Sequence, residues 1–377
     1  MMGFDATFWA LLLLTCITIC SDNNFIVTTT HNATLHKIIK DNNIIVRGEF
    51  DFGAGLKGFV ASFDPLVEHM LTNDAEVLNV RKDVTFPPID YVNEVRKNTL
   101  HRATQTNVTY GLDLLDGIVD GLYNYQGNGS GVDVYVLDTG VKVDHPDFEG
   151  RARWGFPYDG LQDDNNGHGT HVAGIVASKT YGVAKLANII AVKVINDTGK
   201  GTLSELLLGL NYVLNTHKKS LKQKSVVNLS LTGAPDDDLE KAISIMVDQG
   251  IAFAAASGNK HVDACTLSPA RMTNVFTTAA MGEFGYIGNF ANYGKCVKMI
   301  APGIRILSTC VEEPFCLKTG TSMASPFAAG ALAQAYSLKK FDSVKDVYKY
   351  ISTCARRDVV KGKLMDTPNL LLKTPKA

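Results

Sequence analysis

Five mainly apolar, strand-like runs alternate with helical patterns from Gly131 onward, and this alternation restricts the fold more than any other feature. The runs are residues 132–137, 189–195, 226–231, 251–256 and 275–280. Helical spacing predicts helices near residues 171–177, 203–216, 239–249 and 322–338. Strands that are apolar throughout are typical of a parallel sheet covered by helices on both faces, so we expect an α/β domain. Ligands of such sheets bind beyond the carboxyl ends of the strands.

The first hundred residues follow a different pattern. Alternation predicts strands at residues 57–63 and 76–86, with a short helix at residues 65–71 between them. Pro87-Pro88 interrupts regular structure, and the polar residues 98–107 are typical of an exposed linker. We therefore expect three parts: an N-terminal segment, residues 1–20, a small α+β domain, residues 21–102, and a large domain, residues 103–377.

The N-terminal segment is typical of a secretory signal peptide. Its apolar run from Phe8 to Ile19 is shorter than the roughly 18 residues that span a bilayer, and cleavage near Cys20 would remove it. The alternative is a buried N-terminal helix. No other apolar run reaches that length, which argues against a multi-pass membrane protein. We expect a protein of the secretory pathway or the extracellular space.

Cysteine and asparagine patterns favour the same compartment. Five cysteines remain after residue 20, without the CxxC spacing of a zinc site, so we expect no structural zinc. Sequons for N-glycosylation stand at Asn32, Asn107, Asn128, Asn196 and Asn228, the last within a predicted buried strand. Lys+Arg of 37 against Asp+Glu of 38 gives a formal charge of -1, which does not support nucleic-acid binding.

Three polar motifs stand at predicted strand ends or helix starts. Asp138 ends the strand Val-Tyr-Val-Leu-Asp, His168 lies in Asn-Gly-His-Gly-Thr-His, and Ser322 lies in Gly-Thr-Ser-Met-Ala. A serine hydroxyl is a weak nucleophile that needs a base, and a histidine base needs a carboxylate to fix its tautomer. Each residue alone is more typical of a cap, a turn or a solvated position. The glycines beside all three favour the catalytic interpretation, because a substrate backbone can approach there.

A possible oxyanion donor and a possible metal site also lie near these motifs. The small-residue strand before Ser257-Gly258-Asn259 can form a pocket wall, and the Asn259 amide can donate a hydrogen bond to a developing oxyanion. His168 and His171 also suggest a metal site, but no HExxH pattern accompanies them.

These blocks resemble the subtilisin-like serine proteases, and within them the proteinase K group. The order Asp, His, Ser is that of subtilisin, and the resemblance continues in residues 144–152, 178–185 and 290–294. It covers the chain from about Ala103 to the C-terminal helix. The resemblance implies a subtilisin-like three-layer sandwich with a mainly parallel sheet, and a secreted serine endopeptidase.

The resemblance also assigns roles. Ser322 would be the nucleophile, His168 the general base and then acid, and Asp138 its orienting carboxylate. Asn259 and the Ser322 N–H would form the oxyanion hole. Protein or peptide substrates would lie as an added strand between two edges. The residues of these edges and of the pocket are Gly199, Lys200, Gly201, Ser230, Leu231, Thr232, Gly233, Ala256, Ser257 and Gly258.

The pocket walls carry no charge, so we expect a broad preference for apolar or aromatic residues before the cleaved bond. Thr232 replaces a glycine of close relatives and narrows the substrate channel. Phe327 replaces a histidine outside the triad. Lys298 stands where the proteinase K group has its principal calcium carboxylate, and since a cation cannot ligate calcium, that site is expected to be lost. We expect no required cofactor and no catalytic metal.

The small domain resembles the inhibitory propeptide of these enzymes, through residues 58–63. The resemblance implies a zymogen that is inhibited by its own propeptide and cleaves itself in the joint from Asn98 to Ala103. We expect the product to be a monomer.

Resemblance to bacterial relatives that join cysteines at both matching places implies a Cys265–Cys296 disulfide. Cys310 and Cys316 flank a Glu-Glu-Pro turn that could pair them, which leaves Cys354 as a free, buried thiol. The alternative is that all five are reduced core residues.

Two other functions remain open from the sequence. A catalytically silent relative could bind or escort another protein, but such proteins usually lose a triad residue or the oxyanion asparagine. A secreted glycan- or ligand-binding domain would need an aromatic platform near the motifs, and none is evident.

Overall fold

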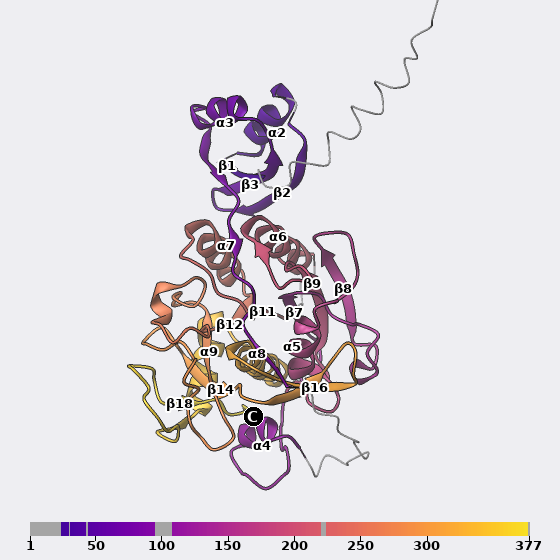
Figure 1. Cartoon of the computed structure of the whole chain (residues 1–377), viewed down its shortest axis with the longest axis vertical. Coiled ribbons are helices and arrows are strands. Elements are labelled where there is room, and N and C mark those ends of the chain that lie inside the picture. Colours follow the sequence, from indigo (N-terminus) through magenta and orange to yellow (C-terminus); the bar gives the residue numbers. More distant parts are fainter. Residues whose placement is uncertain (1–23, 30, 43, 95–107, 220–223, 376–377) are drawn as a thin grey trace, which may run out of the picture. The chain divides into compact units, whose positions relative to one another are not determined.

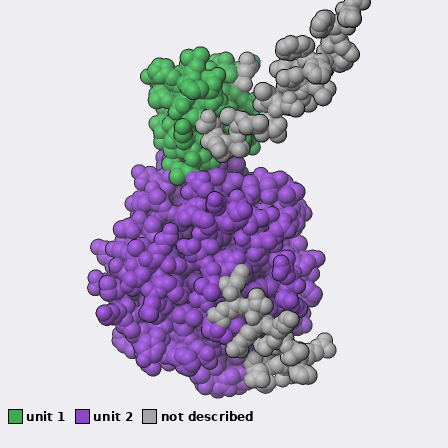
Figure 2. Space-filling view, viewed as in Figure 1, with its two compact units in different colours: residues 1–84 green, residues 85–377 purple. Residues whose placement is uncertain are grey.

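The computed structural model describes residues 24–29, 31–42, 44–94, 108–219 and 224–375. It divides into two compact units, residues 1–84 and residues 85–377 (Figure 1; Figure 2). The predicted signal peptide, the joint at residues 98–103 and the sequon at Asn107 lie outside the described residues.

Unit 1 is a small α+β domain in its described part. Its four strands pair antiparallel in the order β2-β3-β1-β4. The elements are β1 (Asn24–Thr29), α2 (Asn32–Asp41), β2 (Val46–Gly53), β3 (Leu56–Ser62), α3 (Pro65–Thr72) and β4 (Val77–Lys82). Val27 and Phe59 on the sheet pack with Leu35, Ile38 and Leu71 on the helices, and all five are buried.

The predicted strand at residues 76–86 is in fact two strands. β4 belongs to the sheet of unit 1, whereas β5 (Thr85–Phe86) pairs with β10 (Gly201–Thr202) inside unit 2. Asp83, between them, donates its N–H to the Asn24 carbonyl and closes the sheet edge. Alternation alone cannot show such a break, because both halves keep an extended backbone.

Unit 2 is built on a nine-stranded sheet in the order β17-β18-β14-β13-β12-β11-β7-β9-β8. All neighbours pair parallel except β17 and β18. The central strands are β7 (Val132–Asp138), β9 (Asn188–Lys193), β11 (Lys224–Leu229), β12 (Ala252–Ala256), β13 (Phe276–Met281) and β14 (Met299–Pro302). The flanking strands are β8 (Ala152–Pro157), β17 (Arg356–Arg357) and β18 (Leu370–Leu371). This confirms the three-layer α/β fold expected from the sequence.

Helices cover both faces of this sheet. Figure 1 shows α6 (Leu203–Lys218) and α7 (Asp237–Asp248) on one side, and α5 (His168–Ala177) and α8 (Thr321–Leu338) on the other. α9 (Val344–Cys354) packs on α8, and the short α4 (Tyr110–Asp116) precedes β7 in the chain. A capping box defines the start of α6: Thr202 accepts from the Glu205 N–H, and the Glu205 carboxylate accepts from the Thr202 N–H.

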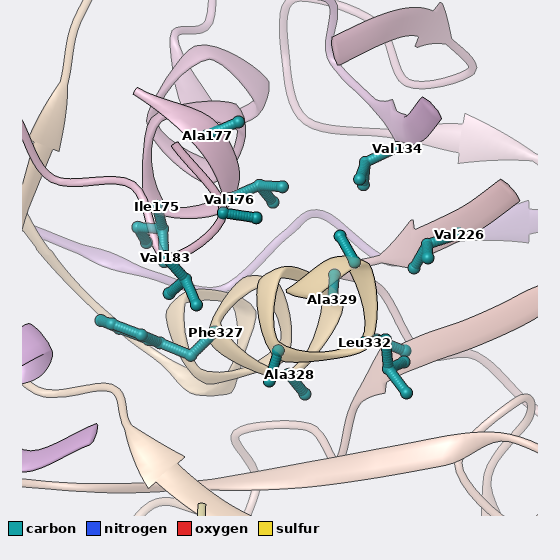
Figure 3. Packing of buried hydrophobic residues seen from close by; sticks show 14 of the residues in the cluster. Val134, Ile175, Val176, Ala177, Val183, Val226, Phe327, Ala328, Ala329 and Leu332 are labelled. Atoms are coloured by element: carbon teal, nitrogen blue, oxygen red, sulfur yellow. The ribbon is translucent and has the colours of Figure 1, made fainter. Parts of the chain in front are cut away.

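The main core lies between α8, α5 and the sheet. Figure 3 shows Phe327, Ala328 and Leu332 of α8 packed with residues of α5 and the strands, all of them buried. Small residues on α8 let it approach the sheet closely, so the helix start is held firmly. No helix among the described residues is both long and apolar enough to cross a membrane.

Two pairs of cysteines lie within disulfide distance. Cys265 pairs with Cys296, with Cα atoms 5.3 Å apart. Cys310 pairs with Cys316 at a Cα distance of 5.8 Å, across the antiparallel hairpin of β15 (Ile306–Thr309) and β16 (Phe315–Thr319). Among the described cysteines, Cys354 is the free one, and it is half-buried where the sequence had suggested full burial.

Candidate active site

The Asp138 and His168 side chains meet at the carboxyl edge of the sheet. Asp138 is the last residue of β7, and His168 is the first residue of α5. Nδ1 of His168 lies 2.7 Å from Oδ1 of Asp138, and both side chains are fully buried. The same carboxylate oxygen accepts the Thr139 N–H at 2.8 Å. This geometry fixes the imidazole with Nδ1 toward the carboxylate and leaves Nε2 as the reactive nitrogen.

Ser322 stands at the start of α8, where the buried helix holds it almost completely covered. Its hydroxyl donates to the Ser230 carbonyl at 3.1 Å. Within the described part of the chain, Nε2 of His168 has no hydrogen-bond partner. In this state the Ser322 hydroxyl is thus hydrogen-bonded to Ser230 and not to His168.

Asn259 follows β12 and presents its amide to the cleft. Its Oδ1 accepts from the backbone N–H and the hydroxyl of Thr321, both at 2.8 Å. Since the oxygen is held there, the Nδ2 group points the other way, and it donates to the Asp90 carbonyl at 2.6 Å. The amide is therefore already oriented toward a peptide carbonyl, as an oxyanion donor must be.

Asp164 is a buried residue that sequence reasoning missed. Its Oδ1 accepts from the Thr139 hydroxyl at 2.7 Å and from the Gly167 N–H at 2.8 Å. Its Oδ2 accepts from the N–H and the hydroxyl of Thr170. One carboxylate thus fastens the end of β7 to the start of α5. The only sequence signal is an acidic residue four positions before His168.

The predicted substrate edges lie on either side of the cleft. Gly201 pairs with Phe86, and the Gly199 carbonyl accepts the Ile89 N–H at 3.1 Å. Lys200 is exposed in a turn closed by Asn196. Of the predicted pocket residues, those that line one common cavity are Ser230, Leu231, Thr232, Gly233, Ala256 and Gly258. Ser257 is the exception, because it is buried and its hydroxyl donates to the Asn292 carbonyl at 3.1 Å.

That cavity has a volume of about 260 Å³, and Asn259 and Ser322 are among the residues that line it. Leu231, Ala256 and Leu267 give it apolar walls. Lys260 also lines it, as an exposed cation that the sequence analysis did not place there. The inner pocket fits an apolar side chain, while its rim carries a positive charge.

Lys318 of β16 is a second cation beside the site. It is 3% exposed, and its ammonium donates to the Gly167 carbonyl at 3.1 Å. Burial lowers the pKa of Lys318 to about 8, with Asp164 and Asp138 opposing that shift. His171, one turn along α5, is fully buried with Nε2 near the carbonyls of Ile306 and Cys316. Burial, and secondarily Lys318, holds the pKa of His171 well below its usual value.

Lys298 stands at the position where the resemblance places a calcium carboxylate. It is half-buried, and burial lowers the pKa of its ammonium. The described residues contain no group of three or more His, Cys, Asp or Glu placed to hold a metal ion.

Chemically, the arrangement suits acyl transfer at a peptide carbonyl. An imidazole oriented by a buried carboxylate can accept a hydroxyl proton. An amide donor fixed opposite the helix start can stabilise the oxygen of a tetrahedral intermediate. Two strand edges can hold an extended peptide between them.

Comparison with known proteins agrees with this geometry. The model of the subtilase family matches residues 129–369. The chain is 36% identical to alkaline protease 2 of Aspergillus fumigatus, over 86% of this chain and 70% of that protein. It is 35% identical to the subtilisin-like serine protease Pen c 2 of Penicillium citrinum, over 92% of this chain and 85% of that protein.

Other matches cover different shares of the relative. The chain is 36% identical to the subtilisin-like serine protease pepC of Aspergillus niger and spans 64% of its length. The crystal structure of a cold adapted subtilisin-like serine proteinase superposes with a TM-score of 0.68 at 34% identity, covering 72% of this chain and 100% of that one. The chain therefore belongs to the subtilase family of serine endopeptidases.

Proposed function

We propose that this chain hydrolyses peptide bonds in proteins through an acyl-enzyme on Ser322, with His168 as general base and Asp138 as its orienting carboxylate. The Asn259 amide and the Ser322 N–H stabilise the oxyanion. The observation that carries the proposal is the contact of the Asn259 amide with a backbone carbonyl, beside Ser322 and the buried Asp138–His168 pair.

Substrate specificity is proposed to be broad. Backbone pairing along Gly199–Gly201 and Ser230–Gly233 does not read side chains. The apolar walls of the pocket favour an apolar or aromatic residue before the cleaved bond, because a Lys or Arg there would lose hydration without a partner. Cleavage of a random peptide library confined to Lys-Arg pairs would contradict this preference.

We further propose that the protein is made as a secreted zymogen. Support comes from the apolar run from Phe8 to Ile19, from the two cysteine pairs at disulfide distance, and from residues 87–90, which line the cavity at the candidate site. Of the described sequons, Asn228 is a poor acceptor, because it is fully buried and bonded to Ser230 and Ser325. Glycan mapping of secreted protein should find Asn228 unmodified.

A serine-directed phosphonate probe tests the proposed chemistry on protein that an added protease has processed and that is then separated from that protease, so that Ser322→Ala, which cannot cleave itself, is compared in the same form as the wild type. The wild type should be labelled, and Ser322→Ala should not. Ser352→Ala is the matched control, since that hydroxyl only donates to the Tyr348 carbonyl on α9, and it should label like the wild type. Labelling that persists in Ser322→Ala, or absence of labelling and of peptide hydrolysis in the wild type, would refute the proposal.

A further inference from the structure

Residues 85–94 run through the candidate active site from one end to the other. On one side, β5 (Thr85–Phe86) pairs with β10, and the Ile89 N–H donates to the Gly199 carbonyl at 3.1 Å. A Cβ placed on Gly233 would collide with the Phe86 ring, so that ring lies against the second substrate edge. Residues 85–89 thus use the backbone and surface that a substrate would use before its cleaved bond.

On the other side, the chain continues as a strand. β6 (Val92–Glu94) pairs antiparallel with β16, with Val92 opposite Thr319 and Glu94 opposite Leu317. Between the two paired segments, the Tyr91 ring lies 5.0 Å from the His168 ring, centre to centre. The Tyr91 hydroxyl donates to Asn166 at 3.3 Å, and the Lys318 ammonium lies 4.1 Å from the Tyr91 ring centre. Three separate contacts therefore fix Tyr91 beside the base.

The reacting carbonyl can be identified between these segments. Asn259 donates to the backbone oxygen of Asp90, the residue directly before Tyr91, whose ring lies at a tilt against His168. An oxyanion donor marks the carbonyl carbon that a nucleophile attacks, and the base must reach the nitrogen that leaves. Asp90 supplies the first and Tyr91 the second.

We infer that Asp90–Tyr91 is the peptide bond that this protein first cleaves in itself, upstream of the joint from Asn98 to Ala103 that the sequence suggested. This inference rests on the proposed function. Ser322 Oγ attacks the Asp90 carbonyl carbon while its proton passes to Nε2 of His168. The bond to the Tyr91 nitrogen then breaks, and the proton moves to that nitrogen. Water next splits the Asp90 ester, which restores the Ser322 hydroxyl and leaves Asp90 with a free carboxylate.

The Asp90 side chain itself is exposed, and the cavity of about 260 Å³ remains open beside it. Cleavage after a residue that does not fill the pocket is feasible here, because the bond is held in place by its own chain at high effective concentration. A leucine at this position would reach the apolar walls formed by Leu231, Ala256 and Leu267. Asp90→Leu should therefore speed the first cleavage, by about tenfold if half of the transfer free energy of the side chain is realised.

Refolding of the full chain without its signal peptide, quenched with acid over a time course, tests the inference. Intact mass and N-terminal sequencing should show a first large fragment that begins at Tyr91, with a partner that ends at Asp90. Two proline variants are matched: Tyr91→Pro replaces the leaving nitrogen by a ring nitrogen and should slow this cleavage more than tenfold, whereas Ala103→Pro should leave the first fragment unchanged.

The outcomes separate the two proposals. A first fragment that begins between residues 98 and 103 at the earliest time, blocked by Ala103→Pro and not by Tyr91→Pro, overturns the Asp90–Tyr91 assignment. If Tyr91→Pro does not fold, the wild-type fragment masses and the rate of Asp90→Leu still decide it. Hydrolysis of an added peptide, absent in Ser322→Ala, is measured in parallel. If the wild type hydrolyses the peptide but its first fragment is a different one, only this inference is refuted. If the wild type does not hydrolyse the peptide, the proposed function is refuted.

Discussion

Removal of the Cys265–Cys296 crosslink gives the most quantitative test of the fold. The two residues are 31 positions apart. If the bond acts by restricting the unfolded chain, closing a loop of that length contributes about 3.7 kcal/mol at 25 °C. The double substitution Cys265→Ala with Cys296→Ala, in a Ser322→Ala background that prevents self-digestion, should lower the free energy of unfolding of unit 2 by roughly 3–4 kcal/mol. Urea denaturation followed by tryptophan fluorescence measures it.

The same change should leave the oxyanion geometry intact. The segment between Asn259 and Cys265 is also held by hydrogen bonds to residues just before Cys296. Asn292 accepts the N–H groups of Lys260 and Val262 at 3.0 and 3.1 Å, and Ala264 donates to the Tyr293 carbonyl at 2.8 Å. Asn259 itself is fixed by Thr321. With Ser322 present, the double variant should therefore keep kcat/KM for a peptide substrate within about threefold of the wild type.

A matched crosslink provides the control. Cys310 and Cys316 are only six positions apart, which gives about 2.2 kcal/mol by the same calculation. Loss of stability below about 1 kcal/mol for the Cys265 and Cys296 pair, or an equal loss for both pairs, would refute the loop-entropy reasoning. Full alkylation of Cys265 in non-reduced protein would show that the bond does not form at all.

Three further predictions concern buried side chains that can carry a charge. Because the pKa of His171 is low in the folded chain, only the unfolded chain binds a proton there near pH ~6.5, so the free energy of unfolding is highest above that pH and falls below it by up to ~1.4 kcal/mol per pH unit. His171→Gln should remove this part of the pH dependence, measured by urea denaturation at pH 7.5 and 5.5, and an unchanged pH dependence would contradict the reasoning. Lys193 is fully buried against Asp163, Asp159 and Asp197, so Lys193→Met should lower the free energy of unfolding by about 2–3 kcal/mol in urea denaturation. The exposed control Lys179→Met should lower it by less than about 1 kcal/mol, and similar losses for the two variants would refute the reasoning. Asp164→Asn removes two of the four hydrogen bonds that the carboxylate accepts, so it should lower kcat more than about tenfold while KM changes less than about threefold. A rise in KM with kcat unchanged would argue against a positioning role.

The sheet was predictable because its strands are buried on both faces. The apolar runs at residues 132–137 and 251–256 match β7 and β12 to within one residue, since a central parallel strand leaves no polar alternation to confuse the period. The edge strand β8 was missed for the opposite reason. Its sequence Ala-Arg-Trp-Gly-Phe-Pro is half-buried and contains a glycine and a proline, so it has no clear period.

The candidate site divides in the same way. The positions of Asp138, His168, Ser322 and Asn259 near strand ends or helix starts were predictable from their glycine-rich motifs, whereas their catalytic roles stay a proposal. Lys318 was not, since Leu317-Lys318-Thr319 alternates like a strand with an exposed lysine, yet this ammonium is buried against Gly167 and Tyr91. The Lys318 ammonium contacts Gly167, more than 150 positions earlier in the chain, and Tyr91, more than 220 positions earlier, and no local pattern encodes such contacts.

If the protein is activated by the proposed cleavage after Asp90, the contacts around this residue also indicate which step limits activation. The Ser322 hydroxyl donates to the Ser230 carbonyl, and a hydrogen bond of this kind contributes only about 1 kcal/mol, so turning the hydroxyl toward His168 is a fast step. The segment to be released is held more firmly, through β5 on β10 before the bond and through β6 on β16 after it. Cleavage separates these two pairings, and each then dissociates alone. Dissociation of the cleaved segment, and not the chemistry of its bond, should therefore limit the appearance of activity toward other substrates.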